Sequence, residues 1–283
     1  MKHRLVISLL SCLLAVSTVA QQKQLYILQT SDTHSRIEPI AADAADKYAG
    51  MGGVARRAAF VKSYREQHPG ALLFDCGDIS QGTPYYNFFQ GELEVKAMNS
   101  MGYDAMAIGN HEFDFGMENL ARLCRLADFP ILSANYDVTG TELEGLVKPY
   151  VVLHREGLKI GVFGISPKLE GLVQADKCAG ITYKDPVATA VEVVALLKER
   201  ECCDVVICLS HLGIQPGNGA AEGYDNALVA KTKDIDLILG GHTHTFMEKP
   251  AVYLNEVGQE VPIMHVGKNG VYVGEIRLTV SEH

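Results

Sequence analysis

The feature that most constrains the fold of this chain is a unit that recurs along it: a short apolar run rich in Val, Ile and Leu, a loop with Gly, Asp or His, and then a helical pattern. Alternation of this kind predicts an α/β fold with sheets buried between helices. The predicted strands cover residues 25–29, 71–75, 105–108, 130–134, 159–165, 205–209 and 237–239. The predicted helices cover residues 53–66, 93–101, 117–126 and 187–200, where apolar residues recur at three- and four-residue steps. Three more strands, at 251–255, 262–266 and 271–280, are expected to form a mixed or antiparallel end.

A chain of 283 residues, 47% of them hydrophobic, can bury one large core or two small ones. The sequence contains no internal repeat, no low-complexity tract and no long linker. A single globular domain covering residues 24–283 is therefore expected.

The first residues differ in character from the rest of the chain. Lys2 and Arg4 precede an uncharged apolar run that ends in small residues, so residues 1–20 are predicted to be a secretory signal that is cleaved. The alternative is a retained membrane anchor, because the uncharged stretch 5–22 approaches the length of a membrane span. A lipid anchor at Cys12 fits less well, since the apolar run continues beyond it. We expect an exported protein, periplasmic or extracellular, with no membrane span in the mature chain.

The charge balance limits the partners of the chain. The formal net charge is −9, and loss of Lys2 and Arg4 with the signal makes it −11. An acidic surface repels nucleic-acid backbones, which argues against a nucleic-acid polymer as the partner. If the substrate is a phosphate ester, its charge must be met locally, and metal ions are the obvious means.

Six cysteines remain after the predicted cleavage, and they allow two interpretations. Disulfides suit an oxidising compartment, whereas Cys76 and Cys208 lie in apolar strand-like runs that favour buried, unpaired thiols. We favour unpaired thiols. The six are Cys76, Cys124, Cys178, Cys202, Cys203 and Cys208.

Side chains that can bind metals follow five of the predicted strands, at the edge where an α/β sheet presents its ligands. Each group alone is weak evidence, but five strand ends with such residues are hard to explain by packing needs. The carboxylate, amide and imidazole set suits two divalent ions such as Zn, Mn, Fe, Co or Ni better than calcium. Two such ions against two Asp carboxylates leave a net charge of about +2, which can hold a phosphate dianion. The candidate ligands are Asp32, His34, Asp78, Asn110, His211, His242 and His244.

The chain resembles the calcineurin-like metallophosphoesterases, specifically the catalytic domain of the 5′-nucleotidase and UDP-sugar hydrolase family. The resemblance runs through nearly all of the mature chain, and the block of residues 110–115 is its most telling part. The matching segments are residues 30–34, 75–84, 107–114, 132–135, 209–213, 240–244 and 266–270.

The resemblance implies a four-layer αββα sandwich of two mixed β-sheets flanked by helices, the metallo-dependent phosphatase fold. It also implies hydrolysis of phosphate monoesters, above all 5′-nucleotides, by in-line attack of a metal-bridging hydroxide. Asp78 would bridge the two ions. The first ion would be bound by Asp32, His34, Asp78 and His244, and the second by Asp78, Asn110, His211 and His242.

His111 and Asp114 are the catalytic candidates that the resemblance implies. His111 would stabilise the transferring phosphoryl group or protonate the leaving oxygen, and Asp114 would orient its imidazole. Asn110 and His111 would also contact the substrate. The alternative for His111 is a further ligand or a structural hydrogen bond, and Glu112 is expected to be a supporting or solvent-exposed carboxylate.

Some residues are interpreted as ordinary structure. The aromatic residues between 85 and 89 are expected to pack, with stacking on a nucleotide base as the alternative. No special role is expected for His68, His154 or His265.

The chain departs from the family pattern in two places. Ser35 stands where glycine is common, and the sequence stops where family members continue into a second domain that contacts the nucleoside and its phosphate. A separate chain could supply that domain. Three functions therefore stay open: a 5′-nucleotidase-type monoesterase, a phosphodiesterase or pyrophosphatase acting on cyclic nucleotides or nucleotide sugars, and a non-catalytic metal-binding scaffold for a partner chain.

Overall fold

The computed structural model describes residues 22–215 and 223–281, most of which belong to two six-stranded sheets and their covering helices. The first sheet contains, in spatial order, β14 (Gly274–Ser281), β1 (Gln22–Thr30), β2 (Leu72–Asp75), β3 (Ala105–Ala107), β4 (Ile131–Leu132) and β6 (Val147–Lys148). The second contains β12 (Ala251–Leu254), β13 (Glu260–His265), β11 (Leu237–Gly240), β10 (Val205–Ser210), β8 (Leu158–Ile165) and β7 (Tyr150–Arg155). A small third sheet pairs β5 (Tyr136–Asp137) with β9 (Thr182–Tyr183).

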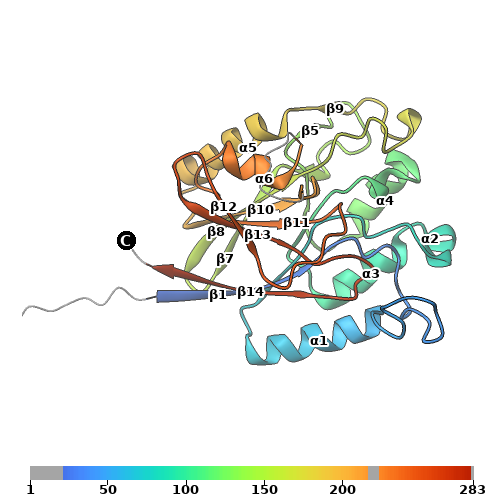
Figure 1. Ribbon diagram of the computed structural model, residues 1–283. Coiled ribbons are helices and arrows are strands. Elements are labelled where there is room, and N and C mark those ends of the chain that lie inside the picture. The colour runs from blue at the N-terminus through green and yellow to red at the C-terminus, as the bar shows by residue number, and fades with distance from the viewer. Residues whose placement is uncertain (1–21, 216–222, 282–283) are drawn as a thin grey trace, which may run out of the picture.

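Helices cover the outer faces of both large sheets (Figure 1). The first sheet is covered by α1 (Val54–Gln67), α3 (Glu92–Met101) and α4 (Gly116–Leu126). The second is covered by α5 (Pro186–Ala195), its π-helical extension η3 (Leu196–Arg200) and α6 (Asp225–Ala230). The shorter elements are α2 (Pro84–Phe89) and the 3₁₀ turns η1 (His111–Phe113) and η2 (Ala175–Lys177).

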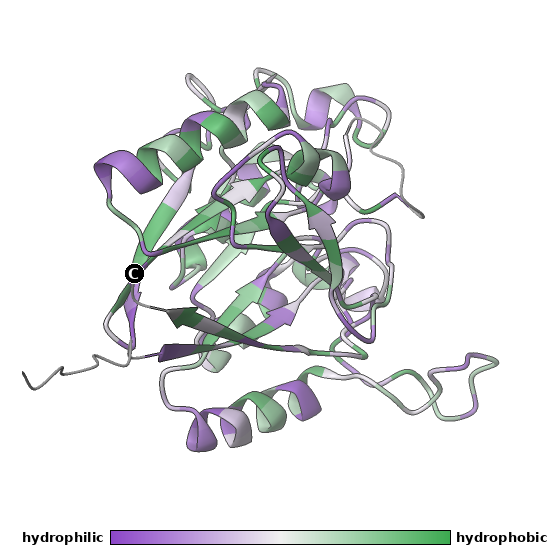
Figure 2. Ribbon diagram, turned by 60° about the vertical axis from the view of Figure 1, so that its left-hand side comes forward, coloured by the Kyte–Doolittle hydropathy of each residue, from purple (hydrophilic) through white to green (hydrophobic). Residues whose placement is uncertain are grey.

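The period-two alternation of side chains along the strands builds three apolar layers. Ile27 of β1 and Ile207 of β10 belong to one cluster between the two sheets. Leu28 faces the other way and belongs to the cluster that includes α1, α3 and α4, while Val206 belongs to the cluster that includes α5 and α6. Figure 2 shows the hydrophobic strands enclosed in this way. The predicted four-layer sandwich of two mixed sheets is confirmed.

Strand direction decides where the functional loops meet. β1, β2, β3, β4 and β6 run parallel to one another, as do β8, β10, β11 and β13. Among the described strands of the two large sheets, β14, β7 and β12 are antiparallel to their neighbours, and each lies at an edge. In each sheet the loops that follow the parallel strands therefore emerge at a common edge.

The predicted strands and helices are all found, with ends shifted by a few residues, but several elements were missed. β7 pairs with β8 through a turn at Glu156 and Gly157, both with positive φ (50° and 70°). The glycine at position 157 is the hairpin signal in the sequence. α2 and α6 have six residues each, too few for a helical pattern to be visible. The last strand begins at Gly274 rather than 271.

The predicted signal, residues 1–20, lies outside the described residues. Within residues 22–215 and 223–281, no helix has the length and apolarity needed to cross a membrane. The six cysteines of this part of the chain are all unpaired, as we favoured.

Candidate metal centre

Five loops, following β1, β2, β3, β10 and β11, meet between the carboxyl edges of the two sheets. Direct hydrogen bonds join loops of different sheets. The backbone N–H of His242 donates to Asp32 Oδ1 at 3.0 Å, and Nδ1 of His211 lies 2.6 Å from the carbonyl oxygen of Cys76. The two sheets are thus tied together at the place where the candidate ligands lie.

Six of the seven candidate ligands form two compact triads. Asp32, His34 and His244 form one, and Asp78, His211 and His242 form the other, with the ligand atoms of each triad within 4.8 Å of one another. In the first, Nε2 of His34 lies 2.9 Å from Nε2 of His244. In the second, Nε2 of His211 lies 3.0 Å from Asp78 Oδ2. Each triad contains three of the four residues that the resemblance implies for one ion; Asp78 belongs only to the second triad and Asn110 to neither.

Asn110, the seventh candidate, has a buried amide oxygen that is left without a hydrogen bond. Oδ1 of Asn110 and Nε2 of His211 are both buried and have no hydrogen-bond partner of good geometry among the described residues, despite the short distance from His211 to Asp78. Buried polar atoms are costly unless something binds them. A nitrogen and oxygen donor set with such orphaned atoms fits divalent transition metals.

The backbone of this centre is strained. Positive φ angles occur at five non-glycine candidate ligands: Asp32 (50°), His34 (49°), Asp78 (58°), His242 (75°) and His244 (54°). Each left-handed residue costs on the order of 1 kcal/mol, and such strain concentrates at functional sites. The strain therefore marks these loops independently of the side-chain chemistry.

Hydrogen bonds to the outer ring nitrogens orient two of the imidazoles. Nδ1 of His34 lies 3.3 Å from the carbonyl oxygen of Ser80, and Nδ1 of His211 faces that of Cys76. A ring nitrogen that donates to a carbonyl keeps its proton, which leaves Nε2 directed into the centre as a ligand.

The buried ionisable groups of the centre shift one another's pKa values. Burial, supported by the nearby Asp78 carboxylate, raises the pKa of Asp32 to about 7. Burial opposes ionisation of Asp78 as well, but the imidazoles of His211, His111 and His34 outweigh it and hold the pKa of Asp78 well below its ordinary value. For His211, burial disfavours the imidazolium, yet Asp78 and Asp32 prevail and raise its pKa to about 10.

Two other ring nitrogens are ready to bind a cation. Burial is the main reason that the pKa of His242 and of His244 falls to about 4. Both rings are therefore neutral near pH 7, as a metal ligand must be.

His111 and Asp114 lie beside the triads. Nδ1 of His111 is 2.8 Å from Asp114 Oδ2, and its ring centroid is 5.5 Å from that of His34. The hydrogen bond to Asp114 is the main cause that raises the pKa of His111. The pair is part-buried, so a substrate bound at the triads could reach Nε2 of His111.

Two supporting carboxylates were missed or undervalued in the sequence. Glu112 is buried and accepts three backbone N–H bonds, from Asp78, Ile79 and Gly109. Asp225 is buried and links Ser210 Oγ (2.5 Å) to His265 Nε2 (2.7 Å) beneath the loops after β10 and β11. Neither carboxylate stands in a sequence pattern that distinguishes it from an exposed one.

The remaining residues singled out in the sequence lie elsewhere. The aromatic run forms α2, where Phe88 is 79% exposed, so packing alone does not explain it. His68 stacks on Tyr26 with ring centroids 3.9 Å apart, and His154 is exposed on β7. No metal cluster in the described residues includes either histidine.

Comparison with known proteins agrees with this geometry. The sequence profile of the calcineurin-like phosphoesterases matches residues 25–246. A snake venom 5′-nucleotidase from Gloydius brevicauda is 33% identical over 95% of this chain and 47% of its own length, so the chain spans about half the length of the curated relatives it matches.

Two solved structures are similar as well. The 5′-nucleotidase precursor from Thermus thermophilus aligns with a TM-score of 0.81 and 30% identity, over 90% of this chain and 51% of that one. A calcineurin-like phosphoesterase from Bacillus subtilis aligns with a TM-score of 0.77 and 29% identity, over 93% and 87%. This chain is therefore a member of the calcineurin-like phosphoesterase family.

Proposed function

We propose that this chain hydrolyses phosphate monoesters, with 5′-nucleotides as the main substrates, at a centre of two divalent ions. The observation that carries the proposal is the pair of triads, together with the orphaned amide oxygen of Asn110. The names of the relatives at about 33% identity favour 5′-nucleotides as the substrate class.

The proposed ligands are divided between the ions as the triads divide them. Asp32, His34 and His244 would hold one ion, and His211, His242 and Asn110 the other, with Asp78 shared between them. Bound there, the ions would supply Lewis acidity and lower the pKa of a water molecule.

The other residues would act on the substrate directly. Asn110 and His111 would contact the phosphoryl group, since they begin the turn η1 beside both triads. His111 would donate a proton from Nε2 to the leaving oxygen, because Asp114 holds Nδ1 and favours the charged ring. Asp114 would position the ring without touching the substrate.

The test combines one substitution with metal analysis. In the purified protein, His111→Ala should lower kcat for AMP or an aryl phosphate by about two to four powers of ten and leave the content of bound metal unchanged. His154→Ala, at an exposed position of β7, is the matched control and should keep full activity. Unchanged turnover in His111→Ala would contradict the role proposed for this residue.

Assays on a panel of esters separate the other candidate functions. Faster turnover of cyclic nucleotides or nucleotide sugars than of AMP would favour the phosphodiesterase or pyrophosphatase alternative. Metal binding without any turnover would favour the scaffold. Turnover of the aryl ester but not of AMP would indicate that nucleotides require a second domain or a separate chain.

Export remains a prediction that goes with this function. Residues 1–20 would be removed on secretion into the periplasm or the extracellular space, and N-terminal sequencing of the mature protein tests it. A protein that begins at Met1 in an exported fraction would contradict cleavage.

A further inference from the structure

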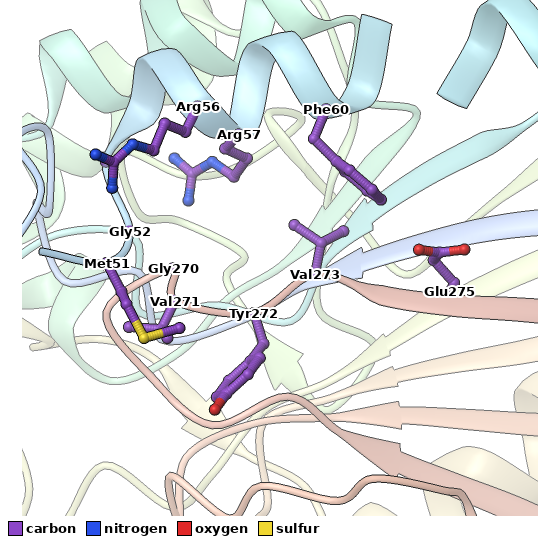
Figure 3. A pocket seen from close by; sticks show the side chains of 11 residues that line it. Met51, Gly52, Arg56, Arg57, Phe60, Gly270, Val271, Tyr272, Val273 and Glu275 are labelled. Atoms are coloured by element: carbon purple, nitrogen blue, oxygen red, sulfur yellow. The ribbon is translucent and has the colours of Figure 1, made fainter. Parts of the chain in front are cut away.

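A second pocket lies away from the two triads, between the start of α1 and the segment that leads into β14. Its volume is ≈ 380 Å³, within the range of small-molecule sites. Figure 3 shows Arg57 and Phe60 projecting from α1 toward residues 270–275. None of the proposed metal ligands or catalytic residues lines it.

Arg57 is the unusual residue of this pocket. Arg57 is only 7% exposed, and Nε of its guanidinium is buried without a hydrogen-bond partner among residues 22–215 and 223–281. The carboxyl groups of Asp75 and Glu94 feel its charge but do not pair with it. A buried donor without an acceptor is unfavourable, and an anion bound in the pocket would supply that acceptor.

The backbone leaves space for this arginine. Gly270 has a φ of 57°, and a Cβ at this position would lie 2.8 Å from Nη1 of Arg57. Any larger residue would push the guanidinium out of its place. The segment that leads into β14 thus lies close to the end of the Arg57 side chain.

Other groups at this end of the pocket also favour an anion. The N-cap of α1 is Gly53, which has no side chain to accept a hydrogen bond from the helix. The first turn of this 14-residue helix carries no acidic residue, so no carboxylate offsets the positive end of the helix dipole. Arg56 is at the rim, where it donates to the carbonyl oxygen of Gly50. The single carboxylate of the lining, Glu275, lies at the opposite end (Figure 3).

The walls between these ends are apolar. Phe60 and Met51 are 36% and 37% exposed, Val273 faces Phe60 across the pocket (Figure 3), and Val271 also lines it. An inorganic anion would leave these side chains in contact with water. A ligand with an apolar body would cover them, and burial of apolar surface would add to its affinity.

We propose that this pocket binds a small organic anion, a carboxylate or phosphate group on an apolar body. The anionic group would lie against Arg57 and Arg56, and the body between Phe60 and Val273. This inference does not depend on the proposed hydrolytic function, because the two sites share no residue.

Binding of 3-phenylpropionate to the full chain, with divalent metal at a fixed concentration, tests the proposal by calorimetry. The acid should bind, and its neutral amide and acetate should bind at least tenfold more weakly, because the amide lacks the negative charge and acetate lacks the apolar body. Phenylphosphonate, measured in the same way, shows whether a phosphorus anion is preferred to a carboxylate. No binding of either acid at millimolar concentration, or equal binding of the amide, would overturn the proposal.

Substitutions locate the binding. Arg57→Met should weaken it about 10- to 100-fold and, without ligand, keep or raise Tm, because a buried donor without an acceptor is removed. If Arg57 instead has a structural role, Tm falls. Arg56→Gln and Phe60→Ala change exposed positions and should weaken binding even if Arg57→Met does not fold. Lys62→Gln removes a charge from the exposed side of the same helix and should change nothing; wild-type affinity in all three pocket variants would refute the site.

Discussion

Glu112→Gln tests whether a carboxylate that need not touch a metal ion holds the centre together. Glu112 is 3% exposed and joins the loops after β2 and β3. Its Oε2 accepts from the backbone N–H of Asp78 at 3.0 Å and of Gly109 at 2.6 Å, and its Oε1 accepts from that of Ile79 at 2.9 Å. Glutamine has nearly the same shape, so the substitution changes hydrogen bonding with little change in volume.

The magnitude follows from these three contacts. The NH₂ group of glutamine cannot accept, so one backbone donor is orphaned if it replaces Oε1, and two are orphaned if it replaces Oε2. Each orphaned buried donor costs about 1–3 kcal/mol. For a chain of this size 1 kcal/mol corresponds to about 2–4 °C, so one orphaned donor should lower Tm by about 2–12 °C. Since Asp78 would lose its fixed position, metal affinity should fall by about 10- to 100-fold.

Thermal unfolding and metal titration at pH 8 measure both effects. Burial and the Asp78 carboxylate raise the pKa of Glu112 to about 7, so the wild-type group is ionised under these conditions. Glu118→Gln, at an exposed position of α4, is the matched control. If the Glu112 variant has the Tm and the metal affinity of the Glu118 variant, the reasoning is wrong.

Three more predictions concern the same centre. In the metal-free protein the pKa of His211 is raised from 6.5 to about 10. The pairing of charged His211 with Asp78 therefore stabilises the metal-free protein fully below pH 6.5, and this stabilisation is lost as the pH rises through 10. Metal uptake must displace that proton, so affinity should rise about tenfold per pH unit from pH 7 to 9, with about one proton released in calorimetry; a pH-independent affinity would contradict this. Asp225→Asn should unpair a buried donor, lower the free energy of unfolding by about 1–3 kcal/mol and weaken metal binding, whereas the exposed Asp234→Asn should do neither in the same assays. Chelation of the metal should lower Tm relative to protein with metal at 100 times its Kd, where binding contributes about 2.7 kcal/mol; an equal Tm would argue against binding to the folded state.

The sequence was a good guide to the fold because each main strand is a short apolar run with a polar loop at its carboxyl end. The same loops carry residues that are rarely gathered by chance, so Asp32 and His242 could be grouped although 210 positions separate them. Their roles as ligands remain a prediction that metal analysis must test. The sequence does not predict which group a buried side chain contacts when that group is a backbone atom or a distant side chain.

Glu112 and Asp225 illustrate that limit. The bonds of Glu112 go to backbone N–H groups, which every residue except proline has, so no side-chain pattern reveals them. Asp225 meets His265 because α6 packs against β12 and β13, although the two residues are 40 positions apart. Arg57 is the opposite case. Its Nε is buried and lacks a hydrogen-bond partner, and only the structure can show this.

The division of the triads between the sheets connects the fold to the proposed chemistry. Asp32 and His34 follow β1 of the first sheet, whereas the third member of their triad, His244, follows β11 of the second. Asp78 follows β2, whereas its two partners follow β10 and β11. Each triad therefore spans both sheets, and the distance between its ligands depends on how the apolar layer between the sheets is packed. Since protein interiors are close-packed, a substitution in the apolar layer between the sheets should alter both triads together, even though no residue of that layer is a candidate ligand.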